Sequence, residues 1–122
     1  MTLDEIVKAV EGEVIVDAPF TVNVETACAS DLMSDVLLFT KPQMLLITGL
    51  TNPQSIRTAD MAEAPAVVFV RSKYPPAETL KLAEEMGIAV VLCAYTMFEA
   101  AGLLYAAGLK GIGKLPVMRV GS

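Results

Sequence analysis

Hydrophobic positions along this chain follow two patterns, and the two alternate from Met44 onward. Three segments are apolar almost without interruption, at residues 44–48 (MLLIT), 65–70 (PAVVFV) and 88–93 (IAVVLC). Continuous apolar runs of this length are typical of strands buried on both faces, as in a parallel sheet. Each run is followed by a segment with the apolar spacing and end signals of a helix. The resulting β-α-β-α-β-α order predicts an α/β fold, with a mainly parallel sheet and helices packed against it.

The first third of the chain predicts a helix, two short strands and a second helix. Thr2 and Glu5 have the spacing of a capping box, and Gly12 is expected to end that first helix. Strands are predicted at residues 13–16 and within 22–30, and a helix at 31–39. With no linker or repeat visible, we predict a single domain over residues 1–115 and a tail at 116–122.

The helix boundaries in the remaining chain are predicted from capping patterns. A capping box at Thr51–Gln54, with proline in the first turn, opens one helix. Two prolines open the next helix, which Gly87 closes. A further capping box at Thr96–Glu99 opens the last helix, which is expected to end near Gly108.

The last helix is apolar nearly all round, and this changes the expected state of assembly. The chain is 54% hydrophobic with a mean hydropathy of +0.56, which is high for 122 residues with so much surface to expose. We therefore expect a homodimer. The predicted interface lies on the last helix and includes Met97, Ala101, Leu104 and Tyr105. A membrane span is not expected, because Glu99 and a turn signal at Tyr95 divide the apolar stretch.

Charge and composition exclude several classes of function. The net charge is −5, and residues 1–35 carry eight acids against one base, Lys8, so nucleic-acid binding is not expected. The acidic, amphipathic N-terminus does not resemble a signal peptide, so we expect a cytoplasmic protein. The sequence contains no histidine, which removes the usual general base and the commonest zinc ligand. Cys28 and Cys93 lie in apolar segments and are interpreted as core thiols.

Polar residues at the carboxyl ends of the predicted strands are the candidate binding site. Parallel strands end at one edge of a sheet, where ligands of open α/β folds bind. The helix after Asn52 offers free amide groups to an anion, and nearby cations favour negative charge. The candidate ligand-binding residues are Thr48, Gly49, Thr51, Asn52, Arg71, Ser72, Lys73, Tyr95 and Thr96, with Ser30 and Asp31 as neighbours. The alternative is that Thr51 or Asn52 only caps its helix. Asp31 and Asp35, if both helical, would share a face, but no third metal ligand accompanies them.

Several stretches taken together resemble a stand-alone DRTGG domain over roughly residues 1–112. They are ASDLMSDVLLF, LLITGLTNPQSIRTADM, PAVVFVRSKYP, ETLKLAEEMGIAVVL and YTMFEAAGLLY. The resemblance implies a regulatory or interaction domain related in fold to the N-terminal domain of HPr kinase/phosphorylase. In larger proteins of that family the strand before the LELAEEKG-type helix ends in Thr-Gly-Gly. Here it ends at Arg71-Ser72, the Thr-Gly pair is at Thr48-Gly49 one strand earlier, and Leu50-Thr51 replace an acid–arginine pair.

Three functions remain open at this level. The first is a non-catalytic regulatory domain that senses a small anionic ligand, a nucleotide or carboxylate, or that docks on a redox or kinase partner. The second is a small phosphotransfer or accessory enzyme that uses the Thr48–Asn52 loop. The third is a purely structural dimerisation module. We expect no cofactor and no metal, and no catalytic residue is assigned.

Overall fold

Five strands form one sheet at the centre of the molecule in the computed structural model, which describes residues 1–117 and 119. Their order across the sheet is β1-β5-β4-β3-β2. Strands β2 to β5 pair in parallel, and β1 pairs antiparallel with β5 at one edge. The mainly parallel sheet predicted from the apolar runs is confirmed. The strands are β1 (Glu13–Val16), β2 (Thr26–Ala29), β3 (Met44–Thr48), β4 (Ala66–Phe69) and β5 (Ala89–Leu92).

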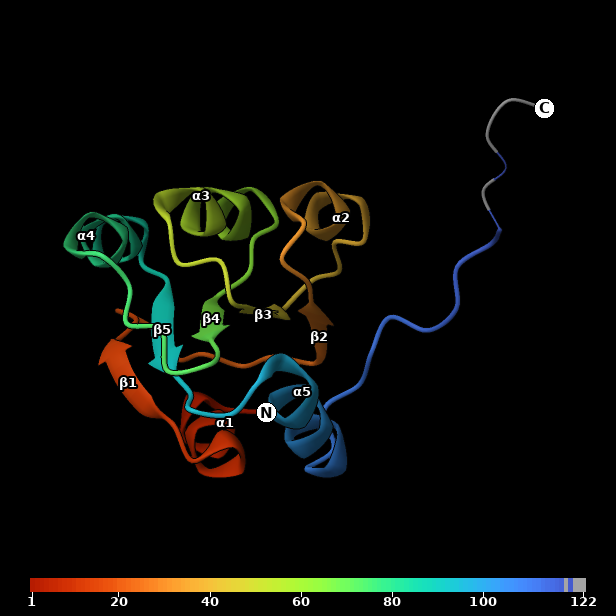
Figure 1. Ribbon diagram of the computed structural model, residues 1–122, viewed down its shortest axis with the longest axis horizontal. Helices are drawn as coiled ribbons and strands as arrows, with labels where there is room; N and C mark the ends of the chain where they lie inside the picture. Colours follow the sequence, from red (N-terminus) through yellow and green to blue (C-terminus); the bar gives the residue numbers. More distant parts are fainter. Residues whose placement is uncertain (118, 120–122) are drawn as a thin grey trace.

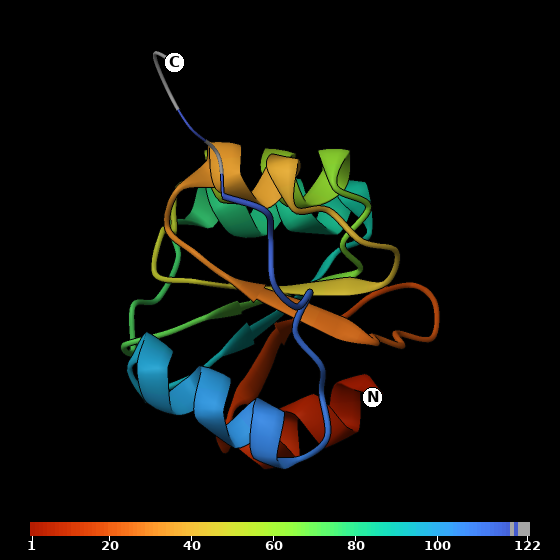
Figure 2. The ribbon, with the colours of Figure 1, turned by 90° about the vertical axis from the view of Figure 1, so that its right-hand side faces the viewer.

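Helices cover both faces of the sheet (Figures 1 and 2). Strands β2 to β5 lie side by side in chain order, so each crossover steps in the same direction. Crossovers of one handedness then place their helices on one face. That face carries α2 (Met33–Leu38), α3 (Pro53–Met61) and α4 (Ala77–Met86), while α1 (Leu3–Val10) and α5 (Met97–Ala106) cover the other.

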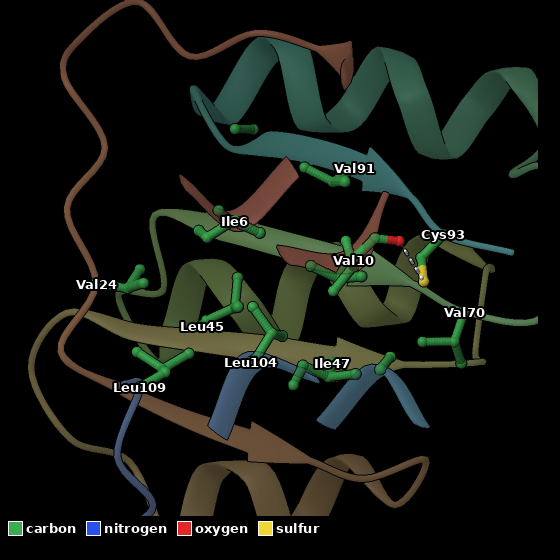
Figure 3. Packing of buried hydrophobic residues seen from close by; sticks show 14 of the residues in the cluster. Ile6, Val10, Val24, Leu45, Ile47, Val70, Val91, Cys93, Leu104 and Leu109 are labelled. Atoms are coloured by element: carbon green, nitrogen blue, oxygen red, sulfur yellow. Dashed lines mark hydrogen bonds between the residues drawn. The ribbon is translucent and has the colours of Figure 1, made fainter. Parts of the chain in front are cut away.

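The core therefore consists of two apolar layers, one on each side of the sheet. Alternate residues of β3 serve the two layers: Leu45 and Ile47 pack towards α1 and α5, whereas Met44 and Leu46 pack towards α2, α3 and α4. Figure 3 shows the first layer, where Leu104 of α5 lies close to Ile47. All five residues of β3 are buried, which explains why the central strands read as continuous apolar runs.

Several predicted element ends are corrected by the structure. The first helix ends in a left-handed residue, but that residue is Glu11, not Gly12. Gly12 is needed for a different reason, because a β-carbon there would lie 2.7 Å from Cγ1 of Val91. The capping box of Thr2 and Glu5 is confirmed. So is the close of α4 at Gly87, whose φ is 70°.

The other two predicted capping boxes are not formed. The residue that caps α3 is Asn52, with proline at the next position, rather than Thr51. At α5, Thr96 is the N-cap residue, but its side chain makes no capping hydrogen bond. Asp31 precedes α2, whose N-cap is Leu32, so Asp31 and Asp35 do not share a helical face as the sequence suggested.

Strand β2 forms the second edge of the sheet, and the chain leaves the domain beside it. The Ala27 amide donates to the Lys110 carbonyl oxygen at 3.0 Å, and the following segment extends away from the domain (Figure 1). Parts of the predicted tail, Met118 and residues 120–122, lie outside the described residues. Within the part of the chain that is described, no helix has the length and apolar character needed to cross a membrane.

Candidate functional site

The carboxyl ends of four strands meet at one edge of the sheet, as the parallel arrangement requires. Backbone hydrogen bonds continue beyond the strands and hold the following loops side by side. The Ser30 amide donates to Ile47, and the Val70 amide donates to Thr48. The Arg71 amide donates to the carbonyl oxygen of Tyr95. The loops after β2, β3, β4 and β5 are therefore fixed relative to one another before any side chain is considered.

Asp31 connects the end of β2 to the Thr48-Gly49 pair at the end of β3. Its Oδ1 accepts a hydrogen bond from the Thr48 hydroxyl at 2.9 Å and another from the Gly49 amide at 2.7 Å. The Thr48 oxygen in turn accepts from the Leu50 amide at 3.1 Å. The amide groups of Gly49 and Leu50 are thus already paired within the protein. The anion-binding capacity predicted for this loop therefore depends less on backbone amides and more on the side chains around it.

The second half of the loop is occupied with structural contacts. Oδ1 of Asn52 accepts from the Gln54 amide at 3.1 Å and caps α3, as the alternative interpretation of this residue proposed. The carbonyl oxygen of Thr51 accepts from the hydroxyl of Thr79 at 2.8 Å, and Thr79 is completely buried on α4. Thr51 and Asn52 hold the loop against α3 and α4.

Arg71 lies over Gly49 from the neighbouring strand end. A β-carbon at Gly49 would be 3.1 Å from Nη2 and 3.3 Å from Nε of Arg71, and 3.5 Å from Oδ1 of Asp31. The guanidinium and the carboxylate therefore share the small space in front of Gly49, which only a residue without a side chain leaves open. We call these three residues, Asp31, Gly49 and Arg71, the strand-end group.

The backbone that carries Arg71 is itself unusual. Arg71 and Ser72 have φ values of 63° and 56°, so two successive residues other than glycine adopt the left-handed conformation. Such a conformation costs energy and is concentrated at functional sites. The bond from the Ser72 amide to the Cys93 carbonyl oxygen, at 3.0 Å, holds the turn in place. Lys73 follows on the same exposed turn and adds a second positive charge.

The two predicted site residues that follow β5, Tyr95 and Thr96, contribute to other parts of the structure. The Tyr95 hydroxyl donates to the Glu11 carboxylate at the end of α1, and this hydrogen bond raises the pKa of Tyr95. Thr96 is the N-cap residue of α5 and is exposed. The structure therefore brings Thr48, Gly49 and Arg71 together, but it directs the Tyr95 hydroxyl towards α1. In the sequence Asp31 is predicted only as a neighbour of the site, and the signal that points to it is a carboxylate two residues after the edge strand β2.

Both cysteines were predicted to be core thiols, and they differ in how far they are buried. Cys93 is completely buried, and its Sγ lies 3.7 Å from the carbonyl oxygen of Val10 (Figure 3). Cys28 on β2 is partly buried. Burial raises the pKa of both thiols, and the charge of Asp35 adds to the effect at Cys28. Among the described residues, no group of three or more acidic or cysteine side chains could hold a metal ion.

The predicted interface residues of α5 differ in accessibility. Met97 and Ala101 are partly exposed and Tyr105 is 72% exposed, whereas Leu104 is only 1% exposed and belongs to the core of its own domain. Leu104 therefore cannot contribute to a surface without unfolding, and this part of the prediction is corrected. Phe98 is 87% exposed, although it is not among the predicted interface residues.

Comparison with known proteins adds information on the fold. No protein-family model matches this sequence. No curated protein matches it either. Among solved structures, the CBS and DRTGG domains of the regulatory region of Clostridium perfringens pyrophosphatase, complexed with the activator diadenosine tetraphosphate, are similar to this chain. The TM-score is 0.74 at 15% sequence identity. The similarity covers 87% of this chain but 46% of that one, so this chain spans less than half of its neighbour. At this identity the likeness establishes the α/β fold of the chain.

Proposed function

We propose that this chain is a non-catalytic regulatory domain of DRTGG type that binds a small anionic ligand at the strand-end group. The observation that carries the proposal is the placement of Arg71, on a left-handed turn, with its guanidinium over Gly49 and beside Asp31. A guanidinium presents a planar fork of donors that matches phosphate and carboxylate oxygens. Lys73 on the same turn adds positive charge for a second anionic group. The relation to the N-terminal domain of HPr kinase/phosphorylase, implied by the resemblance, remains part of this proposal.

Arg71 and Asp31 both lie next to Gly49, and together they favour a ligand that carries both an anion and a hydroxyl donor. Both hydrogen bonds that Asp31 accepts within the protein use Oδ1, so Oδ2 is not engaged in them. A ligand hydroxyl can donate to that oxygen while an anionic oxygen accepts from Arg71. A nucleotide has this combination in its ribose and phosphate, and a hydroxycarboxylate has it in a smaller form. The neighbour that was crystallised with a dinucleotide polyphosphate supports testing nucleotides first.

The affinity should be modest, because the Gly49 and Leu50 amides are already paired within the protein. Micromolar binding corresponds to about −8 kcal/mol. Ligand binding would then be reported to another protein. The redox and kinase proteins considered from the sequence are the first partner classes to test, in a cytoplasmic setting.

The test is isothermal titration calorimetry of the full chain with adenine mononucleotides, diadenosine tetraphosphate and citrate. Arg71→Ala should weaken binding at least tenfold, which corresponds to about 1.4 kcal/mol. Gly49→Val should have a similar effect, because its side chain would displace the guanidinium that now lies 3.1 Å from the β-carbon position. Arg57→Ala is the matched control, since it removes the same charge from an exposed position on α3.

Two results would contradict the proposal. Wild-type protein that binds none of these compounds at millimolar concentration has no such site, and the loop is then only a helix cap. Equal binding by wild type, Arg71→Ala and Gly49→Val would place any site elsewhere. Phosphate release should be measured in the same samples, because saturable hydrolysis abolished by Asp31→Asn would instead favour the phosphotransfer enzyme.

A further inference from the structure

The outer surface of α5 carries a stripe of apolar residues that the fold itself does not cover. Phe98 is 87% exposed and Tyr105 is 72% exposed, and both lie on the same side of the helix at a spacing of seven residues. Ala101 and Gly102 lie between them. These four residues are called the α5 stripe. With Met97 and Ala29 they line a shallow hollow beside the end of the edge strand β2. Exposed aromatic side chains grouped in this way mark an interaction surface.

The order of large and small residues in the α5 stripe is symmetric. Phe98 and Tyr105 lie at equal distances from a midpoint between Ala101 and Gly102. If two α5 helices pack antiparallel about a twofold axis through that midpoint, Phe98 of each copy faces Tyr105 of the other. The small residues then meet at the axis, where the helices can approach closely. A twofold interface needs this self-complementarity, because residue i must contact j while j contacts i.

The chemistry of the stripe also favours a second copy over other partners. Glu99 is the single charged residue of α5, so the helix offers no cation to a nucleic acid or an acidic membrane surface. At about 150 Å² or more per aromatic side chain, Phe98 and Tyr105 supply roughly 300 Å² per copy. A stable interface buries about 800 Å² per partner. Met97 and Ala29 line the same hollow as the stripe and can contribute to the remainder.

We infer that the α5 stripe is the twofold interface of a homodimer in which the two α5 helices pack antiparallel. This inference is independent of the ligand site, because it is carried by exposed residues of α5 and not by the strand-end group. Leu104 is buried in the apolar layer between α5 and the sheet and holds α5 on its own domain.

Sedimentation equilibrium on the full chain, from about 1 to 500 μM, provides the basic test. Wild-type protein should approach twice the chain mass of 13.0 kDa within this range. Gly102→Leu should raise the dimer dissociation constant at least tenfold. A β-carbon at Gly102 meets no atom within 4 Å in the folded chain, and leucine favours helix over glycine. The melting temperature of this variant, measured at a concentration where wild type is monomeric, should therefore not fall.

Charge substitutions test the antiparallel arrangement itself. With Phe98→Lys and Tyr105→Glu in one chain, the new ammonium group faces the new carboxylate across an antiparallel interface, and dimers should persist. With Phe98→Lys and Tyr105→Lys, like charges face each other and the protein should be monomeric. Phe20→Ser, which removes an aromatic residue that is 56% exposed outside the stripe, is the control and should leave the mass unchanged.

A monomer mass for wild type throughout the concentration range would overturn the inference; the stripe would then be covered by the chain's own tail or by a different protein. A dimer that persists in both Gly102→Leu and the double lysine variant would place the interface elsewhere. If the two charge variants dissociate equally while Gly102→Leu also disrupts the dimer, the antiparallel arrangement is wrong.

Discussion

Replacing Asp31 with alanine should destabilise this domain more than its exposed position suggests. Its Oδ1 accepts hydrogen bonds from the Thr48 hydroxyl at 2.9 Å and the Gly49 amide at 2.7 Å. Thr48 is completely buried, and Gly49 is buried as well. These two bonds connect the loop after the edge strand β2 to the end of β3, across a separation of 18 residues for the Gly49 contact. Asp31→Ala removes both bonds and leaves two buried donors without their acceptor.

The magnitude follows from the kind of hydrogen bond that is lost. A bond to a charged group contributes about 1.5–3 kcal/mol, and a buried donor left without a partner costs about 1–3 kcal/mol. Because Asp31 itself is exposed, water can reach part of the vacated space and offset some of this cost. We therefore expect the free energy of unfolding to fall by about 2–3 kcal/mol in total. For a domain of this size that corresponds to a decrease in melting temperature of roughly 8–12 °C.

Urea denaturation followed by circular dichroism measures this change directly. Asp35→Ala is the matched control, because it removes the same charge four residues later, where helix-dipole contact contributes about 0.3–1 kcal/mol. Asp31→Asn retains a side-chain oxygen and should recover a substantial part of the loss. The reasoning is refuted if Asp31→Ala and Asp35→Ala differ by less than about 0.5 kcal/mol, a difference typical of substitutions away from specific contacts. It is also refuted if Asp31→Asn is as unstable as Asp31→Ala.

Two further predictions use the pKa shifts. The Thr2 amide and hydroxyl hold the pKa of Glu5 below its usual 4.5. The stabilisation that Glu5 provides is therefore complete above pH 4.5. It is lost as the pH falls through the lower pKa that Glu5 has in the folded state. Glu5→Gln should therefore lose less stability than wild type between pH 5 and pH 3 in urea titrations; parallel pH curves would contradict the capping-box assignment. Cys93, buried and with a raised pKa, should react with a thiol reagent at pH 8 only as the protein unfolds, whereas the partly exposed Cys28 reacts sooner but more slowly than free cysteine. Immediate modification of two thiols per native chain would show that Cys93 is accessible.

The parts of the fold that the sequence determined are those encoded by local patterns. The apolar runs at β3, β4 and β5 have no polar side to expose, and only a sheet covered on both faces accommodates such strands. Thr2 with Glu5, and Gly87 after α4, act within a few residues of their own helices, so their roles were readable in advance. The strand-end location of Thr48, Gly49 and Arg71 followed from the parallel sheet alone.

The tertiary structure decided which of these residues meet and what they contact. Sequence spacing placed Asp31 on a helix with Asp35, whereas its hydrogen bonds to Thr48 and Gly49 depend on β2 lying next to β3. Tyr95 follows β5 and so belongs to the same predicted site, but its hydroxyl donates to Glu11 at the end of α1. Because α5 is apolar on almost every side, its sequence did not show that Leu104 packs inward and Phe98 points outward. Local patterns specify an element and its ends, but contacts between distant residues arise only when the strand order and the covered faces of the sheet are set.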